Sequence, residues 1–146
     1  MNDLHNSSHV RRVLPPAAAG TTGTGRTGKI IDRQGFGGVE FVIDYGAATA
    51  TAYAVGITVL HGDVTGTMTS AADTDLLGTE AYAGLAAGAK TSGLGKNIAK
   101  AVGYKGAKRY VTVKAVPTGA ATGIVGVTAL LHSPNVGPCD NTAFGD

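Results

Sequence analysis

Apolar and polar positions alternate along much of the chain after residue 28. The stretch GVEFVIDYG (38–46) is the clearest case, because every second residue from Val39 to Tyr45 is large and apolar while Glu40 and Asp44 fall between them. A period of two residues is that of a β-strand with one buried face. The stretches AYAVGITVLHGD (52–63) and KRYVTVKAVP (108–117) alternate in the same way.

The stretch GIVGVTALLH (123–132) is different, because both of its faces are largely apolar. This pattern indicates a central strand with neighbours over each face. Gly, Pro, Asp or Asn residues bound each of the four runs, as turn residues do. Together the runs predict an all-β protein, a two-sheet antiparallel β-sandwich of jelly-roll-like architecture.

Between residues 71 and 101 the alternation weakens. The stretch DTDLLGTEAYAGLAAGAK (73–90) has the Asp and Thr residues that can cap a short helix. Its glycines each cost about 1 kcal/mol relative to alanine inside a helix. We therefore expect loops here, with at most one short strand or helical turn.

The first 27 residues show neither a strand period nor a helix period. They mix polar residues with Pro15-Pro16, an alanine run and a Gly/Thr run. The expected organisation is an extended or flexible N-terminal arm over residues 1–27, followed by a β-sandwich domain over residues 28–146.

Composition narrows the class of protein. The chain has 146 residues, of which 43% are hydrophobic and 23 are glycine, and this is too apolar for a disordered protein. The apolar residues are too evenly spread for a membrane span. Gly and Ala bury little side-chain area, so we expect modest stability and a contribution from partner subunits. The lone Cys139 and the absence of a basic, then apolar leader predict assembly in a reducing cytoplasm.

Charge is unevenly distributed along the chain. Residues 28–80 hold seven acids and two bases, a net −5, whereas residues 81–139 hold seven bases and no acid, a net +7. One interpretation is head-to-tail contact between copies or docking on an acidic surface. The other is that the two halves interleave in one fold and neutralise each other locally.

The segment GTGRTGKI (23–30) resembles a nucleotide-binding loop in its glycine spacing alone. A phosphate loop follows a buried strand, opens a helix and ends in a Ser or Thr. Here Pro15-Pro16 stand shortly before the segment, a short β-type run follows it, and Ile30 replaces the hydroxyl residue. We expect no cofactor, and a hinge between arm and body.

No other catalytic or metal-binding pattern is present in the sequence. The four histidines lack metal-ligand spacing, and we interpret His61 and His132 as rim residues at strand ends. The basic run GYKGAKRYVTVK (103–114) could be a nucleic-acid surface with stacking tyrosines. The preferred interpretation is a hairpin that turns at Gly106-Ala107, with no nucleic-acid partner and no membrane partner.

Five stretches in order resemble a family of small virion proteins of tailed bacteriophages and prophages that are encoded near the major capsid protein. They are HVRRV (9–13), GKIIDRQGFGGVEFVIDYG (28–46), DTDLLGTEA (73–81), VGYKGAKRYVTVKAVP (102–117) and VTALLHSPNVGP (127–138). The pieces IIDRQGF and GYKGAKRYV are the most specific, and residues 47–72 are the loosest part of the match.

The resemblance implies a non-enzymatic decoration or cement protein on the outer capsid surface, assembled in the host cytoplasm. Its partners would be the major capsid protein and further copies of itself, as a dimer or trimer. The residues expected to contact the capsid lie in the arm: His9, Val10, Arg11, Arg12, Val13 and Leu14. A further interface is expected at Lys105, Lys108 and Arg109.

Three other functions remain open at this point. The same fold could form a ring in the head-tail connector or the tail, which copy number would distinguish from decoration. It could be a glycan-binding module using Tyr53 or Tyr82, although a chain without Trp is a poor candidate. A small enzyme ranks lowest, and no catalytic residue is assigned.

Overall fold

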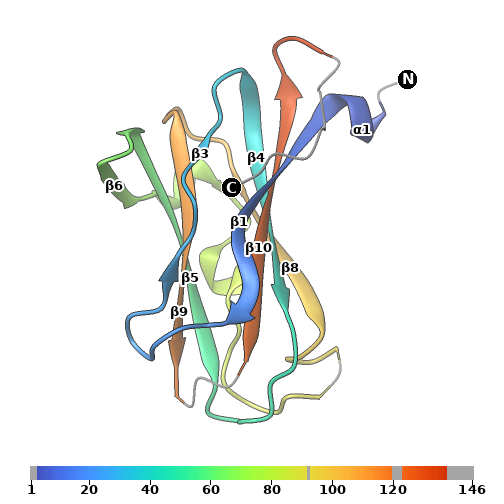
Figure 1. The fold of residues 1–146 in the computed structure, drawn as a ribbon, viewed down its shortest axis with the longest axis vertical. Coiled ribbons are helices and arrows are strands. Elements are labelled where there is room, and N and C mark those ends of the chain that lie inside the picture. The colour runs from blue at the N-terminus through green and yellow to red at the C-terminus, as the bar shows by residue number, and fades with distance from the viewer. Residues whose placement is uncertain (1–2, 92, 120–122, 138–146) are drawn as a thin grey trace.

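The computed structural model describes residues 3–91, 93–119 and 123–137 and contains two antiparallel β-sheets of five strands each. Sheet A has the order β1 (Ser8–Ala18), β10 (Ile124–Pro134), β4 (Phe36–Tyr45), β8 (Ile98–Tyr104) and β7 (Leu76–Leu77). In sheet B, β9 (Tyr110–Thr118) lies between β5 (Ala54–Val64) and two short segments, β2 (Arg26–Thr27) and β3 (Ile31–Asp32). The remaining strand of sheet B, β6 (Thr67–Ser70), pairs with β5. The predicted all-β sandwich is confirmed (Figure 1).

The strand order is that of a jelly roll. If β2 with β3 counts as one interrupted strand, and the two-residue edge strand β7 is set aside, the remaining eight strands wind as two Greek keys. The chain changes sheet after β1, β3, β4, β6, β8 and β9. Consecutive strands therefore usually lie opposite each other and not side by side.

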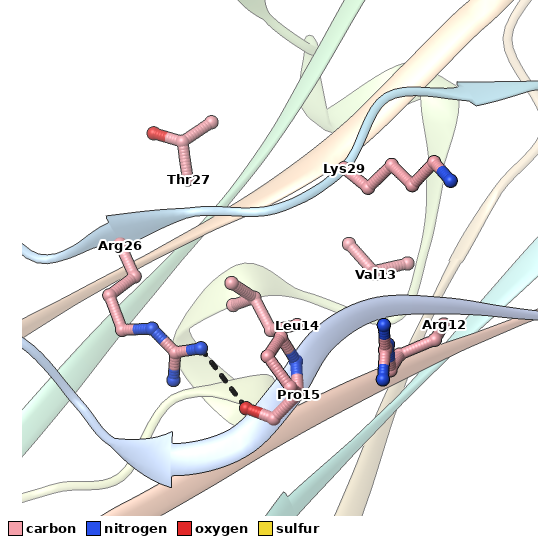
Figure 2. A pocket seen from close by; sticks show the side chains of 7 residues that line it. All are labelled: Arg12, Val13, Leu14, Pro15, Arg26, Thr27 and Lys29. Carbon is pink, nitrogen blue, oxygen red and sulfur yellow. Dashed lines mark hydrogen bonds between the residues drawn. The ribbon is translucent and has the colours of Figure 1, made fainter. Parts of the chain in front are cut away.

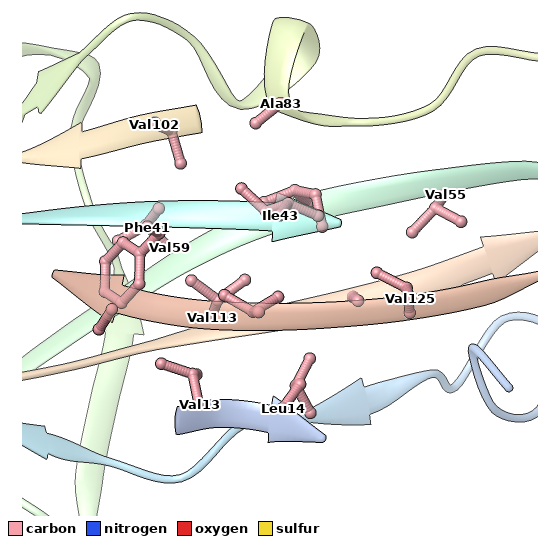
Figure 3. Close-up of a cluster of buried hydrophobic side chains, with 14 of the residues drawn as sticks. Val13, Leu14, Phe41, Ile43, Val55, Val59, Ala83, Val102, Val113 and Val125 are labelled. Carbon is pink, nitrogen blue, oxygen red and sulfur yellow. The ribbon is translucent and has the colours of Figure 1, made fainter. Parts of the chain in front are cut away.

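The core lies between the two sheets and consists of the alternating apolar residues that the sequence shows. Sheet A supplies side chains such as Phe41, Ile43 and Val125, which are at most 2% exposed (Figure 3). Sheet B supplies Val59 and Val113, which are fully buried. Every second residue of β4, β5 and β9 thus lies in the core, as predicted.

The weakly patterned region, residues 71–101, contains more regular structure than expected. It holds the 3₁₀ turn η1 (Asp73–Asp75), β7, the single-turn helix α2 (Glu80–Ala83) and the first four residues of β8. The Thr79 hydroxyl oxygen accepts a hydrogen bond of 3.0 Å from the Tyr82 N–H and so caps α2. This helix contacts β5 and β8 and therefore covers the gap between the two sheets on one side.

The predicted N-terminal arm is wrong for residues 8–18, and with it the domain boundary at residue 28. These residues form the edge strand β1, which pairs with β10 from Ser8 opposite His132 to Ala18 opposite Ile124. The strand was hidden in the sequence because its register shifts twice, between Arg12 and Leu14 and between Leu14 and Ala17. Such bulges break the period of two, and prolines are tolerated on an edge strand.

The basic run at residues 103–114 does not form the predicted hairpin. Tyr104 ends β8 in sheet A, whereas Tyr110 begins β9 in sheet B, so the turn crosses from one sheet to the other. The pattern identified β9 and the turn, whereas more than half of β8 falls where loops were expected. It could not identify the main pairing partners, β4 and β5, because these lie more than 40 residues away in the chain.

The glycine-rich segment is a packed crossing between the sheets and not a hinge. The Gly28 N–H donates to the Val113 carbonyl at 2.8 Å, and the Lys29 N–H donates to the Val13 carbonyl at 2.9 Å. A Cβ at residue 28 would lie 2.3 Å from Val13 Cγ1, so only glycine fits between β1 and β9. Two N–H groups of the supposed phosphate loop are thus already bonded to strands.

Candidate functional site

The six residues expected to contact a capsid belong to a paired strand, and the structure separates them into two groups. His9, Val13 and Leu14 are buried, with 8%, 3% and 3% of their surfaces exposed. Val10 is 55% exposed, Arg12 is exposed and Arg11 is half-buried. Only this second group can contact another molecule without unfolding β1, so the prediction of one continuous binding arm is wrong.

A basic groove runs along the seam where β1 meets β2. Its volume is about 550 Å³, its floor is formed by Val13 and Leu14, and no acidic residue lines it (Figure 2). We call this feature the seam groove; its lining residues are Arg12, Val13, Leu14, Pro15, Arg26, Thr27 and Lys29.

Arg26 holds the seam groove in shape. Its guanidinium donates to the carbonyls of Pro15 at 3.1 Å and Ala18 at 3.2 Å, where the bulged end of β1 leaves them available. Arg26 therefore supplies hydrogen-bond donors to carbonyls of β1 that no strand of the described chain pairs on this side. Lys29 has a different position, because its backbone N–H bonds to β1 while its side chain is exposed to solvent.

The second predicted interface, Lys105, Lys108 and Arg109, lies at one end of the sandwich. The Lys108 ammonium contacts the Asp63 carboxylate at 2.5 Å, and Arg109 binds Asp32 through two hydrogen bonds of 3.0 and 2.6 Å. Lys105 is exposed. Two of the three cations therefore neutralise acids from the first half of the chain. This agrees with the interpretation in which the acidic and basic halves interleave in one fold.

Arg33 is the residue that sequence reasoning missed at this end. Its guanidinium donates to the carbonyls of Lys108 at 2.6 Å, Gly106, Phe36 at 3.3 Å and Gly37 at 3.2 Å. It also lies 5.3 Å from the centre of the Tyr104 ring. One side chain thus joins the turn before β4 to the crossing between β8 and β9.

Beneath Arg33 lies a small polar cluster. The Tyr104 hydroxyl lies 2.9 Å from His61 Nδ1 and accepts a hydrogen bond of 3.2 Å from the Lys108 N–H. Asp75 Oδ2 is 3.8 Å from the same His61 nitrogen. Burial raises the pKa of Tyr104, and the nearby Lys108 N–H and the Arg33 charge offset part of that effect. His61 lies within β5, with its side chain 12% exposed, so it is not a rim residue.

We define the clasp as the contacts that Asp32 and Arg33 make with residues 105–109. The pKa of Asp32 lies below its usual range, chiefly because the Arg109 side chain donates hydrogen bonds to the carboxylate. The pKa of Arg109 is raised by the same contact. These groups are bonded to one another and to main-chain carbonyls, which is the arrangement of a structural connection.

Within residues 3–91, 93–119 and 123–137, no three His, Cys, Asp or Glu side chains are grouped as metal ligands would be. Cys139 lies outside the described residues. No helix in the described part of the chain has the length and apolar character needed to cross a bilayer.

Comparison with known proteins adds no relative. No protein-family model matches the chain, and neither a curated protein nor a solved structure does.

Proposed function

We propose that this chain is a non-enzymatic structural protein of tailed-phage virions, which binds the outer capsid surface as a decoration or cement protein and stabilises the head. The observation that carries the proposal is the clasp. The two stretches that most specifically resemble the virion family, IIDRQGF and GYKGAKRYV, bind each other through Asp32, Arg33 and Arg109, across 75 to 77 residues of chain.

A shared motif pair that interlocks in this way favours a structural role. A catalytic pair would direct side chains into a cleft, where a substrate could reach them. Here the charged groups form hydrogen bonds with main-chain carbonyls and with one another, and Arg33 is half-buried. Such a pair of motifs stabilises the shape of the sandwich.

The seam groove is the surface we assign to the capsid. Arg26 and Lys29 give it positive charge without a lining acid, so it suits an acidic segment of a capsid subunit. This assignment replaces the mobile arm by a rigid groove. Many copies on a symmetric shell would allow contacts that are individually weak to act together.

The location is tested by counting copies in purified phage particles. Quantitative mass spectrometry should find this chain in a simple ratio to the major capsid protein, as a shell-covering protein requires. About a dozen copies per particle, as one ring holds, would instead support the connector or tail. Absence from the particle would refute a virion role and favour a glycan-binding module.

The seam groove is tested by reversing one charge. Lys29→Glu should weaken binding to particles that lack the protein by at least about tenfold, because it places an acid in the groove. Lys105→Glu is the matched control, since it changes the same charge at an exposed residue of the sandwich end. Binding can be measured by co-sedimentation with particles at two salt concentrations. If Lys105→Glu weakens binding and Lys29→Glu does not, the capsid contact belongs to the sandwich end.

A further inference from the structure

The outer face of sheet A is more apolar than a solvent-facing sheet surface needs to be. Strand β10 has large apolar residues on both faces, and its inner face packs in the core. On its outer face Leu130 and Thr128 are half-buried, and no element of the described chain lies over them. Among the described residues, the sequence pattern of a strand covered on both sides is therefore satisfied on only one side.

The outer face extends across the neighbouring strands in register. Leu130 lies between Val10 on β1 and Glu40 on β4. The next row places Thr128 between Arg12 and Val42. Val10 is 55% exposed and Val42 is half-buried, so the apolar surface continues on both sides of β10.

Side chains on this face lie across glycines of adjacent strands. A Cβ at residue 103 would lie 2.5 Å from Glu40 Oε2, so the carboxylate occupies the space above Gly103. A Cβ at residue 38 would lie 2.5 Å from the His132 ring, which lies above Gly38 in the same way. Sheets that pack face to face lie about 10 Å apart with their strands about 30° apart.

Charges on the outer face are arranged in a self-complementary way. Arg12 lies on β1, while Glu40 and Asp44 lie on β4, two strands and about 10 Å away. Along the strands, the row of Arg12 falls midway between those of Glu40 and Asp44, about 7 Å from each. No ion pair joins either carboxylate to a described residue.

A two-fold axis along β10 would exploit this arrangement. The rotation exchanges the positions of β1 and β4 while leaving each row at its own height along the strands. Arg12 of one copy then lies opposite Val42 of the other copy, between its Glu40 and Asp44 carboxylates. The same contact occurs twice, and Leu130 and Thr128 of the two copies meet at the centre. Such an isologous contact is the commonest symmetry of soluble oligomers.

We propose that two copies of this chain associate through the outer faces of sheet A, with Arg12 of each copy bound between Glu40 and Asp44 of the other. Arg12 also has a contact within its own chain. A guanidinium carries five N–H donors, so it can serve an internal and an external acceptor together. This dimer does not depend on the capsid, and it can form or fail to form in the purified chain.

The proposal is tested by exchanging the charges between two variants of the full chain. Sedimentation velocity over a dilution series should show that the natural chain is dimeric. Arg12→Glu alone should raise the dimer dissociation constant at least about tenfold, and so should Glu40→Lys combined with Asp44→Lys, because each places like charges together. An equimolar mixture of the two variants should restore dimers, since every contact in the mixed dimer again joins opposite charges.

Controls separate this outcome from misfolding and from a general charge effect. Lys114→Glu makes the same charge change as Arg12→Glu in magnitude and sign, but lies on β9 of sheet B, and should leave the dimer intact. Circular dichroism establishes that each variant is folded, and Asp44→Lys alone replaces the double variant if Glu40→Lys unfolds the chain. The proposal is overturned by a natural chain that stays monomeric throughout the series, by a dimer that Arg12→Glu leaves unchanged, or by folded variants that remain separate when mixed.

Discussion

At the scale of single residues, Arg33 connects more of the chain than any charged residue that the sequence patterns singled out. Its four carbonyl acceptors belong to two separate segments, residues 36–37 and 106–108. The planar fork of a guanidinium can satisfy several acceptors at once, which the single ammonium group of lysine cannot do. The position therefore requires arginine for its geometry as well as its charge.

Replacing Arg33 should measure how much the clasp stabilises the fold. Arg33→Ala should lower the free energy of unfolding by about 2–3 kcal/mol, because partly buried carbonyls lose a charged donor. Arg33→Lys should recover only part of that loss. Arg109→Ala is the control, since its pair with Asp32 is 46% and 42% exposed and should contribute less than about 1 kcal/mol. Urea titration measures all three; equal losses for Arg33→Ala and Arg109→Ala would contradict a special role for Arg33.

Glu40 should give the isolated chain a distinct pH dependence. Burial raises the pKa of this carboxyl above its usual value, and the charge of His132 offsets the effect in part. The folded state therefore holds the proton to a higher pH than the unfolded state does, and stability falls as the pH rises through the window just above 4.5. Below that window both states are protonated and the penalty disappears.

Glu40→Gln should remove this penalty. The variant should be more stable than the natural chain at pH 7 and equally stable at pH 3.5, when both are studied at concentrations where they are monomeric. Thermal unfolding at several pH values measures the difference, and Asp44→Asn, an exposed carboxyl on the same strand, is the control. A Glu40→Gln variant that is less stable at pH 7 would show that the carboxylate has a favourable partner in the monomer.

At the scale of elements, β1 determines what a truncation would do. Removing residues 1–18 should prevent folding, because Val13 and Leu14 each contribute about 1.5–3 kcal/mol by burial and β10 would lose its neighbour. Removing residues 1–7 should leave a folded protein, since the α-helical turn α1 (Leu4–Ser7) contains no buried residue. Far-ultraviolet circular dichroism and urea titration distinguish the two. A stable sandwich without residues 1–18 would restore the idea of a dispensable arm.

How far the sequence predicted each element depended on how regular that element is. Strands β4, β5 and β9 keep a strict period of two, and their buried residues followed directly from it. Strand β1 has two bulges and two prolines, so Val13 and Leu14 are adjacent in sequence and both buried. A pattern search based on alternation cannot recognise such a strand.

At the scale of the whole molecule, charge interleaving follows from the jelly-roll order. The acidic first half and the basic second half are not separate poles, because β9 lies beside β5 and β10 beside β4. Pairs such as Asp63 with Lys108 therefore join the halves locally. What remains unbalanced is the seam groove, and its cations come from β1, β2 and the segment after β2.

The candidate surfaces were only partly predictable because they depend on contacts between distant segments. The sequence identified Arg12 and the basic run, but not that Lys108 and Arg109 would be used in ion pairs. It also gave no reason to place Lys29 beside Val13, which required the crossing between sheets to be known. Spacing along the chain predicts faces of strands, whereas grooves and seams arise from the pairing order.

The pairing of the first strand with the last has a mechanical consequence. Ser8 lies opposite His132, so β1 begins and β10 ends at the same end of sheet A (Figure 1). Tension applied between these two points acts across the hydrogen bonds that join β1 to β10. It would break them in sequence, one residue pair at a time. Compression spread over a sheet face is instead shared by all five of its strands. A shell component with this connectivity would withstand internal pressure when it is held by its faces, and would open when it is pulled by its ends.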